Sequence, residues 1–248
     1  MENLILPGER VDDLQIPLED GRSLRVIQNP EYFCFGVDAV LLANFATVPK
    51  QARIADLGCG CGVVGLLIAA KTEAKQVDGV EIQRSVADMA RRSVALNGLD
   101  RKITVTCADL KGFGQAAAYD VVTCNPPYKE ARGGLVSPNK YVAAARNEIF
   151  CTVADVAAAS ARLLKPGGRL NLIHRPERLV DVVCALRAAG IEPKRVRFVH
   201  PHADKAATMV LIEGARGGKP KLKTEPPLFI YDLDGRYSHE INRIYGKA

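Results

Sequence analysis

The sequence predicts an α/β fold, a doubly wound, mostly parallel seven-stranded sheet with an N-terminal extension. The first observation behind this prediction is that, from residue 52 onward, short apolar runs alternate with helical stretches, the pattern of right-handed crossover units. The second is a composition of 48% hydrophobic and 25% charged residues over 248 residues, as in an ordinary globular protein with a full core. Together they exclude disordered, collagen-like and fibrous chains.

The first fifty residues are expected to form a cover over that sheet. Ser23–Ile27 follows the turn signal Asp20-Gly21 and has the residue types of a strand, and apolar residues recur at helical spacing from Val37 to Ala46. We therefore divide the chain into a cover over residues 1–50 and one doubly wound domain over residues 51–248, which carries a basic C-terminal segment.

Seven strands are predicted from the apolar runs, and four helices from the stretches between them. The expected strands are residues 52–57, 77–81, 103–107, 119–124, 168–174, 194–200 and 207–213. The expected helices are about 62–71, 84–97, 147–164 and 177–189, and Lys165-Pro166-Gly167-Gly168 and Gly190 are expected to stop the last two.

A glycine-rich turn joins the first of these strands to its helix. The segment reads Ile54-Ala55-Asp56-Leu57-Gly58-Cys59-Gly60-Cys61-Gly62-Val63-Val64-Gly65, and such glycines let the backbone approach a nucleotide-type cofactor. Gly60 to Gly65 satisfies the G-x-G-x-x-G pattern of dinucleotide sites, with Glu81 where a ribose-binding acid belongs. However, the Asp56 carboxylate suits the positively charged end of S-adenosylmethionine better than a pyrophosphate. From this turn alone, both cofactors stay open.

Two further acids stand at the ends of successive strands. Glu81 ends the second strand, and Asp109 follows the third. Because the carboxyl ends of parallel strands meet at one edge, both acids are expected to line the crevice where open α/β sheets bind ligands. Asp109 is well placed there to accept a hydrogen bond from an adenine amine.

The fourth strand runs into Asn125-Pro126-Pro127-Tyr128, the most informative tetrapeptide of the chain. The proline pair should hold Asn125 and the Pro126 carbonyl rigidly at the sheet edge. Their two oxygens can accept hydrogen bonds from the N–H groups of an exocyclic amine or amide and thereby direct its lone pair at a methyl group. Tyr128 offers a flat face to a planar substrate. We therefore take the four residues as candidate catalytic residues, the alternative being a strand-ending turn with a structural tyrosine.

Several motifs carry a resemblance to a known superfamily. Asp56-Leu57-Gly58-Cys59-Gly60, Glu81, Asp109 and Asn125-Pro126-Pro127-Tyr128 together resemble the class I S-adenosylmethionine-dependent methyltransferases that modify amino groups. The resemblance implies a Rossmann-like seven-stranded sheet whose last hairpin is antiparallel. It also implies a cofactor site, with Gly58 and Gly60 at the methionine part, Glu81 at the ribose, Asp109 at the adenine, Asp56, Ile82 and Asn125 beside them, and Phe35 and Asp38 closing the pocket from the cover.

Within that superfamily, nearly the whole chain resembles the bacterial tRNA(Val) (adenine-N6)-methyltransferases, which modify the adenine just 3′ of the anticodon. The matching segments are Glu9-Arg10-Val11-Asp12-Asp13-Leu14, Phe35-Gly36-Val37-Asp38-Ala39-Val40-Leu41-Leu42-Ala43, Val80-Glu81-Ile82-Gln83, Ala145-Arg146-Asn147-Glu148 and His174-Arg175-Pro176. The resemblance implies that tRNA is the partner.

Basic residues are expected to meet that RNA. Residues 162–224 hold 14 basic and 5 acidic side chains within a chain of net charge +6. In the last part of this range, glycines and a proline should prevent a helix, so its basic side chains are expected to project from the protein. These are Arg216, Lys219, Lys221 and Lys223. Residues 129–145 resemble a substrate lid, at which Arg132, Lys140 and Arg146 could contact phosphates. A solvated basic face and a disordered loop are the alternatives.

Three other functions stay open. A glutamine methyltransferase acting on release factors would use the same tetrapeptide, but such enzymes have a larger, helical N-terminal domain. An NAD(P)-dependent oxidoreductase would explain the glycine pattern of the turn and leave Asn125 to Tyr128 without a role. A noncatalytic RNA-binding protein would explain the basic excess.

No metal site and no membrane segment are expected. Cys59 and Cys61 are too close for the usual zinc-ligand spacing. The longest apolar runs, such as Val63 to Ala70, are far short of the roughly 20 residues that span a bilayer, and the chain does not start as a signal peptide does. We expect a cytoplasmic protein, with monomer and homodimer both open.

Overall fold

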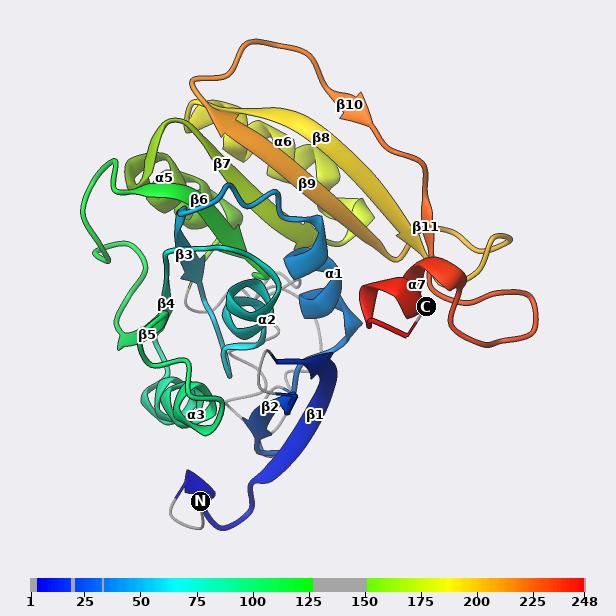
Figure 1. Ribbon diagram of the computed structural model, residues 1–248. Helices are drawn as coiled ribbons and strands as arrows, with labels where there is room; N and C mark the ends of the chain where they lie inside the picture. Colours follow the sequence, from blue (N-terminus) through cyan, green and yellow to red (C-terminus); the bar gives the residue numbers. More distant parts are fainter. Residues whose placement is uncertain (1–3, 19–20, 33, 127–150, 248) are drawn as a thin grey trace.

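The computed structural model describes residues 4–18, 21–32, 34–126 and 151–247. Their main feature is a twisted sheet with the strand order β10-β8-β9-β7-β6-β3-β4-β5 and β11 beside β8 (Figure 1). The seven predicted strands are all present: β3 (Arg53–Leu57), β4 (Gln76–Glu81), β5 (Ile103–Cys107), β6 (Tyr119–Cys124), β7 (Leu164–His174), β8 (Ile191–His200) and β9 (Met209–Arg216).

The strand directions match the expected fold. β5, β4, β3, β6 and β7 pair in parallel, whereas β9 is antiparallel to both β7 and β8. β8 therefore runs in the same direction as β7, and the expected antiparallel last hairpin is confirmed. The number of strands is larger than predicted, because β10 (Lys223–Thr224) and β11 (Leu228–Phe229) add two short parallel pairings to β8.

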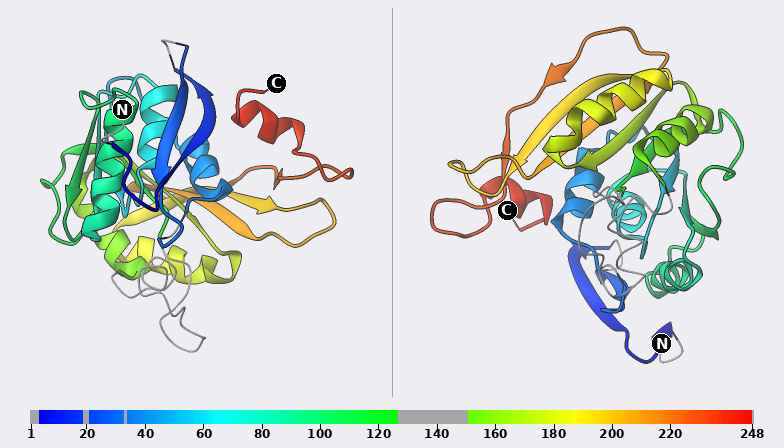
Figure 2. Two further views of the ribbon diagram at one scale, coloured as in Figure 1. Left: turned by 90° about the horizontal axis from the view of Figure 1, so that it is seen from below. Right: turned by 180° about the vertical axis from the view of Figure 1, so that it is seen from behind.

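Helices cover both faces of the sheet, as the alternating pattern predicts. One face packs against α1 (Val37–Phe45), α2 (Val63–Lys71) and α3 (Arg84–Leu96), and the other against α5 (Val153–Leu163) and α6 (Leu179–Ala188), which follows the 3₁₀ turn η2 (Pro176–Arg178) (Figure 2). α7 (His239–Ile244) lies against α1 near the end of the chain. Among the described helices, none is long and apolar enough to cross a bilayer.

One helix end differs from its prediction. The described part of the helix expected over 147–164 begins at Val153, after the capping box of Thr152 and Asp155, and it ends at Leu163. Lys165-Pro166-Gly167-Gly168 follows this end closely, as predicted, but these residues lie within β7 and not in a loop. The physical reason is that these residues form the irregular start of the β6–β7 pairing, where the register shifts between Tyr119 and Val121.

The cover contains a hairpin of which only one strand is evident from the sequence. β1 (Arg10–Pro17) pairs antiparallel with β2 (Ser23–Gln28). The charged residues of β1 interrupt the alternation of apolar and polar residues that would predict a strand. The buried face of β1 consists of Leu14 and Ile16. The hairpin is bound to α3 by hydrogen bonds from the Ile27 N–H to Ser93 and from the Arg25 N–H to Asn97. The cover and the sheet thus share one hydrophobic core.

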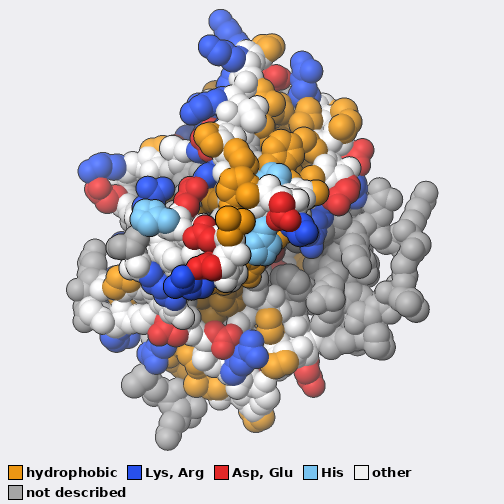
Figure 3. All heavy atoms as spheres, turned by 90° about the vertical axis from the view of Figure 1, so that its right-hand side faces the viewer, with side chains coloured by type: hydrophobic (Ala, Val, Ile, Leu, Met, Phe, Trp, Pro, Cys, Tyr) orange, Lys and Arg blue, Asp and Glu red, His pale blue; other side chains and the backbone are white. Residues whose placement is uncertain are grey.

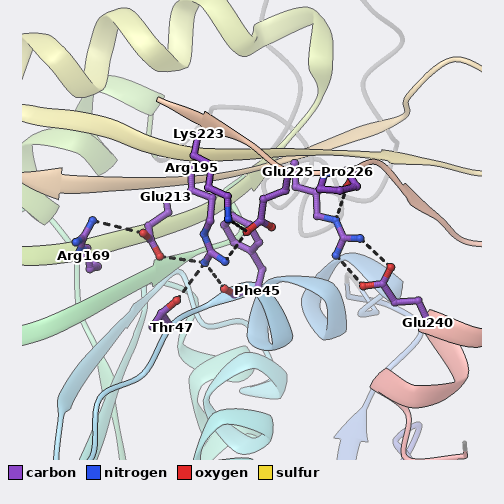
Figure 4. A network of polar contacts seen from close by, with 10 residues as sticks. Phe45, Thr47, Arg169, Arg195, Glu213, Lys223, Glu225, Pro226 and Glu240 are labelled. Carbon is purple, nitrogen blue, oxygen red and sulfur yellow. Dashed lines mark hydrogen bonds and ion pairs between the residues drawn. The ribbon is translucent and has the colours of Figure 1, made fainter. Parts of the chain in front are cut away.

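The C-terminal segment wraps over β8 and is fixed by two arginines (Figure 4). Arg195 donates to the Phe45 carbonyl and forms ion pairs with Glu213 and Glu225. Arg197 makes a bidentate pair with Glu240 at 2.7 and 2.8 Å. On the face turned to the right in Figure 1, hydrophobic side chains and histidines gather over this segment (Figure 3). Tyr231, Tyr237 and Tyr245 stack in series, and His202 lies tilted against Tyr231.

The Glu9–Arg92 ion pair, which fixes the cover to α3, gives a first prediction. Arg92 contacts Glu9 at 2.5 and 2.7 Å, and the two side chains are only 13% and 6% exposed. We expect Arg92→Leu to lower the free energy of unfolding by about 2–4 kcal/mol, because it leaves a buried carboxylate unpaired. Lys50→Ala is the control, since the Lys50–Glu73 pair is 79% and 62% exposed and should contribute less than about 0.5 kcal/mol. Equal losses in urea titrations of the two variants would contradict this account.

Candidate active site

The candidate site lies at the carboxyl edge of the four strands β5, β4, β3 and β6. Leu57, the last residue of β3, is in register with Val80 of β4 and with Cys124 of β6, and Glu81 pairs with Cys107 of β5. Neighbouring strands are about 4.8 Å apart. The glycine turn, Glu81, the loop that starts after β5 and Asn125 therefore follow one another along a single edge.

The glycine turn has the backbone conformation that its sequence predicts. Gly58, Gly60 and Gly62 have φ values of 66°, 55° and 89°, which side chains disfavour. A Cβ atom added at Gly58 or Gly60 would meet no atom within 4 Å, so the outer surface of the turn is bare backbone. The turn packs closely on β4, because a Cβ at Gly79 would lie 3.0 Å from the Cys59 sulfur.

Glu81 is buried beside this turn. Its two carboxylate oxygens accept hydrogen bonds from the backbone N–H groups of Gly60 at 3.2 Å and Gln83 at 2.8 Å. Burial raises the pKa of Glu81 above its ordinary value, and the backbone hydrogen bonds oppose that rise. Each carboxylate oxygen can accept more than one hydrogen bond, so Glu81 can also accept from hydroxyl groups of a ligand.

Asp56 lies under the turn, on the side of the sheet that faces α2. Its Oδ1 accepts a hydrogen bond of 2.7 Å from the Thr123 hydroxyl, and Oδ2 has no hydrogen-bond partner among the described side chains. Burial raises the pKa of Asp56 to about 7, although the Thr123 hydrogen bond lowers it. A buried carboxylate favours a cationic ligand over an anionic one. Sequence reasoning missed Thr123, whose signal is a hydroxyl within the otherwise apolar run Val121-Val122-Thr123-Cys124.

The remaining cofactor candidates border the same edge. Asp109 is exposed just beyond β5 and accepts a hydrogen bond from the Lys111 N–H at 2.9 Å. Ile82 is a 39% exposed apolar side chain next to Glu81. Phe35 is half-buried and packs against the core of the cover. These three side chains give the edge an acid and two apolar surfaces.

Asn125 follows β6 and meets the cover. Its Nδ2 donates to Asp38 Oδ2 at 3.1 Å, and Asp38 Oδ1 accepts from the Ala39 N–H at 2.9 Å. Asp38 is buried in the first turn of α1. Pro126 is buried as well, whereas Pro127 and Tyr128 lie outside the described residues, as do Arg132, Lys140 and Arg146.

The C-terminal cations lie at the opposite edge. Because β9 is antiparallel to β7, its last residue, Arg216, stands at the amino edge of the parallel strands. The expectation that Arg216 projects is wrong, since its guanidinium donates to the Leu164 carbonyl. Lys219, Lys221 and Lys223 are exposed; Lys223 lies 3.9 Å from Glu225, and the Lys219 carbonyl accepts from Lys194.

Comparison with known proteins gives one family match and several similar methyltransferases. The methyltransferase small domain family matches residues 24–183. A tRNA1(Val) (adenine(37)-N6)-methyltransferase of Tolumonas auensis is 30% identical over 206 residues, covering 83% of this chain and 85% of the relative. An Aeromonas hydrophila protein of the same name is 29% identical over 204 residues, covering 82% and 84%.

Solved structures show the same fold. A predicted O-methyltransferase from Agrobacterium tumefaciens superposes with a TM-score of 0.69 at 24% identity, over 85% of this chain and 97% of that one. A geranyl diphosphate C-methyltransferase from Streptomyces coelicolor A3(2) gives a TM-score of 0.55 at 15% identity, over 72% and 79%. At these identities the likeness concerns the fold alone.

The buried Asp56 predicts a pH-dependent stability. From pH 4 to 7, the unfolded chain has an ionised Asp56 while the folded chain keeps its proton, so wild-type stability falls as the pH rises, by up to roughly 1.4 kcal/mol per pH unit. Asp56→Asn stays neutral. Its stability relative to wild type should therefore rise from pH 5 to 7 and level off above.

Urea unfolding of the cofactor-free protein at pH 5, 6, 7 and 8 measures this difference. Thr123→Val removes the hydrogen bond that favours the ionised form, so in that background the levelling-off should move to higher pH. A difference between Asp56→Asn and wild type that stays constant with pH would show that Asp56 is already ionised in the folded protein.

Proposed function

This chain belongs to the methyltransferase small domain family and is an S-adenosylmethionine-dependent methyltransferase, and from that premise we propose that it methylates the N6 amine of an adenine in tRNA, at the position 3′ of the anticodon of tRNA(Val). The observation that carries the proposal is the position of Asn125 and Pro126, at the end of β6 and one strand away from the glycine turn. The names of the relatives support tRNA as the substrate class.

The described residues fit the cofactor. Bare backbone at Gly58 and Gly60 leaves room for the methionine part, and the nearby Asp56 carboxylate favours its cationic groups. Glu81 would accept from the ribose hydroxyls, and Ile82 and Asp109 would contact the adenine face and its amine. The bound cofactor supplies an electrophilic methyl group on a sulfonium.

The nucleophile is activated by its surroundings. The lone pair of the adenine N6 amine is delocalised into the ring, so the amine is a poor nucleophile. The Asn125 side-chain oxygen and the Pro126 carbonyl would each accept a hydrogen bond from one N–H group of the amine. These two contacts favour a pyramidal nitrogen with its lone pair directed at the methyl group. The C–N bond would form as the methyl–sulfur bond breaks, with the bonding electrons going to sulfur. The methylated cationic nitrogen would then lose one proton to water, so this reaction needs no strong general base.

Two of the other functions are disfavoured by specific observations. A dinucleotide would bring its anionic pyrophosphate close to the buried Asp56, and the family match is to methyltransferases. The amide group of a glutamine side chain could make the same hydrogen bonds to the Asn125 and Pro126 oxygens. However, the relatives of this chain named above are tRNA methyltransferases, which favours adenine over glutamine as the substrate.

The substrate is tested with radiolabelled S-adenosylmethionine and, separately, total tRNA, rRNA, DNA and release factors. We expect label only in the tRNA pool, as N6-methyladenosine. Asn125→Ala should lower the transfer rate by ~10²–10³-fold, because an aimed acceptor at the reacting nitrogen is lost, and leave cofactor affinity within about twofold. Asn242→Ala, in α7, is the control for an asparagine away from the site. Label in release factors, or an Asn125→Ala enzyme of near wild-type rate, would contradict the proposal.

Glu81 should act on binding and not on the chemical step. Two hydrogen bonds from ribose hydroxyls to a carboxylate predict that Glu81→Ala weakens S-adenosylmethionine binding by on the order of 2–4 kcal/mol. Calorimetry measures this directly, and the fold of the variant is checked by thermal unfolding without cofactor. Unchanged affinity in a folded variant would place the ribose elsewhere.

A further inference from the structure

The contact between the cover and the end of β6 gives Asp38 a role of its own. We propose that Asp38 is a positioning residue that fixes the amide orientation of Asn125, so that the amide oxygen and not the NH₂ group faces the target amine. This inference rests on the proposed function, because it assumes that Asn125 must present an acceptor. The observation behind it is the 3.1 Å hydrogen bond from Asn125 Nδ2 to Asp38 Oδ2.

The chemistry of the two groups makes the contact directional. An ionised carboxylate only accepts hydrogen bonds, whereas an amide donates at one end and accepts at the other. A 180° turn of the amide would replace the hydrogen bond by two oxygens at about the same distance. Losing a hydrogen bond to a charged acceptor and adding this repulsion should disfavour the flipped amide by on the order of 10²-fold. A flipped amide would offer N–H groups to an amine that itself must donate.

Asp38 is held in place independently of Asn125. Its other oxygen, Oδ1, accepts from the Ala39 N–H at 2.9 Å, and the side chain is buried in the first turn of α1, where a negative charge is favoured by the helix dipole. The preceding backbone fits closely around it, because a Cβ atom at Gly36 would lie 3.0 Å from Asp38 Oδ1. The carboxylate is therefore a fixed reference against which the amide is oriented.

This contact also links two distant parts of the chain. Asp38 belongs to the cover and Asn125 to the sheet, and 87 positions separate them in the sequence. The cover thus contributes to the geometry of the reacting group. Any change that displaces α1 should affect the rate of transfer before it affects cofactor binding.

The test uses Asp38→Ala and the nearly isosteric Asp38→Asn, with kcat measured at saturating tRNA and cofactor, and cofactor affinity measured by calorimetry. With that bias removed, the two amide orientations become about equally populated, so we expect kcat to fall at least about twofold in Asp38→Ala and by less in Asp38→Asn, which can accept from Asn125 but tolerates the flipped amide as well. The KM for tRNA and the cofactor affinity should stay within about twofold. Asp38→Asn keeps the inference testable where Asp38→Ala does not fold.

A double-mutant cycle separates positioning from other roles. Because Asp38 acts through Asn125, Asp38→Ala/Asn125→Ala should be no slower than Asn125→Ala alone. Additive losses, a large loss of cofactor affinity, or a full kcat in both Asp38 variants would overturn the inference. The proposed function fails separately, since it is contradicted when Asn125→Ala itself retains full activity, whatever the Asp38 variants do.

Discussion

The parallel pairing of β3 with β4 on one side and with β6 on the other is the constraint on which the site depends. The chain leaves β3 toward β4 and β5, then crosses to β6 and β7, so the connections at the carboxyl edge diverge on the two sides of β3, which is where open α/β sheets bind ligands. The register of these two pairings puts the glycine turn between Glu81 and Asn125. The Asp56–Thr123 hydrogen bond crosses the same β3–β6 boundary and adds a polar contact to it.

Buried carboxylates gather at this edge at a cost in stability. Asp38, Asp56 and Glu81 are all buried, from α1, β3 and β4 respectively. Burial raises the pKa of Asp56 and of Glu81, which means that the folded state disfavours their ionised forms. Asp56 and Glu81 thus destabilise the folded protein in the absence of a ligand. This is consistent with a site that binds a ligand with positive charge and hydroxyl groups.

Much of the fold could be predicted because its signals are local. Each central strand is a short apolar run, and the turn after β3 can be predicted from its glycines, which tolerate positive φ. β1 was missed because its charged residues interrupt the apolar pattern, and β10 and β11 because two-residue strands have no period. Lys165 to Gly168 follow the helix end as a stop should, yet they lie within β7, between Leu164 and Arg169, which pair with β6.

The sequence suggests candidate residues for the site, but not the contacts among them. Motifs point to Asp56, Glu81 and Asn125, whereas nothing local indicates that Thr123 binds Asp56 or that Asp38 binds Asn125, since these contacts join elements distant in the sequence. For Arg216 the sequence predicts a contact with solvent, because the residue lies in a basic run. In the folded chain its guanidinium instead donates to the Leu164 carbonyl, which belongs to a distant part of the sequence.

A structure of the protein with S-adenosylhomocysteine and an RNA containing the target adenosine would test the central claim most directly. The account predicts that the N6 amine lies within about 3.2 Å of both the Asn125 side-chain oxygen and the Pro126 carbonyl, with the cofactor sulfur in line with the lone pair of the nitrogen. An adenine bound elsewhere, or an amine contacted by the Asn125 NH₂ group, would contradict it.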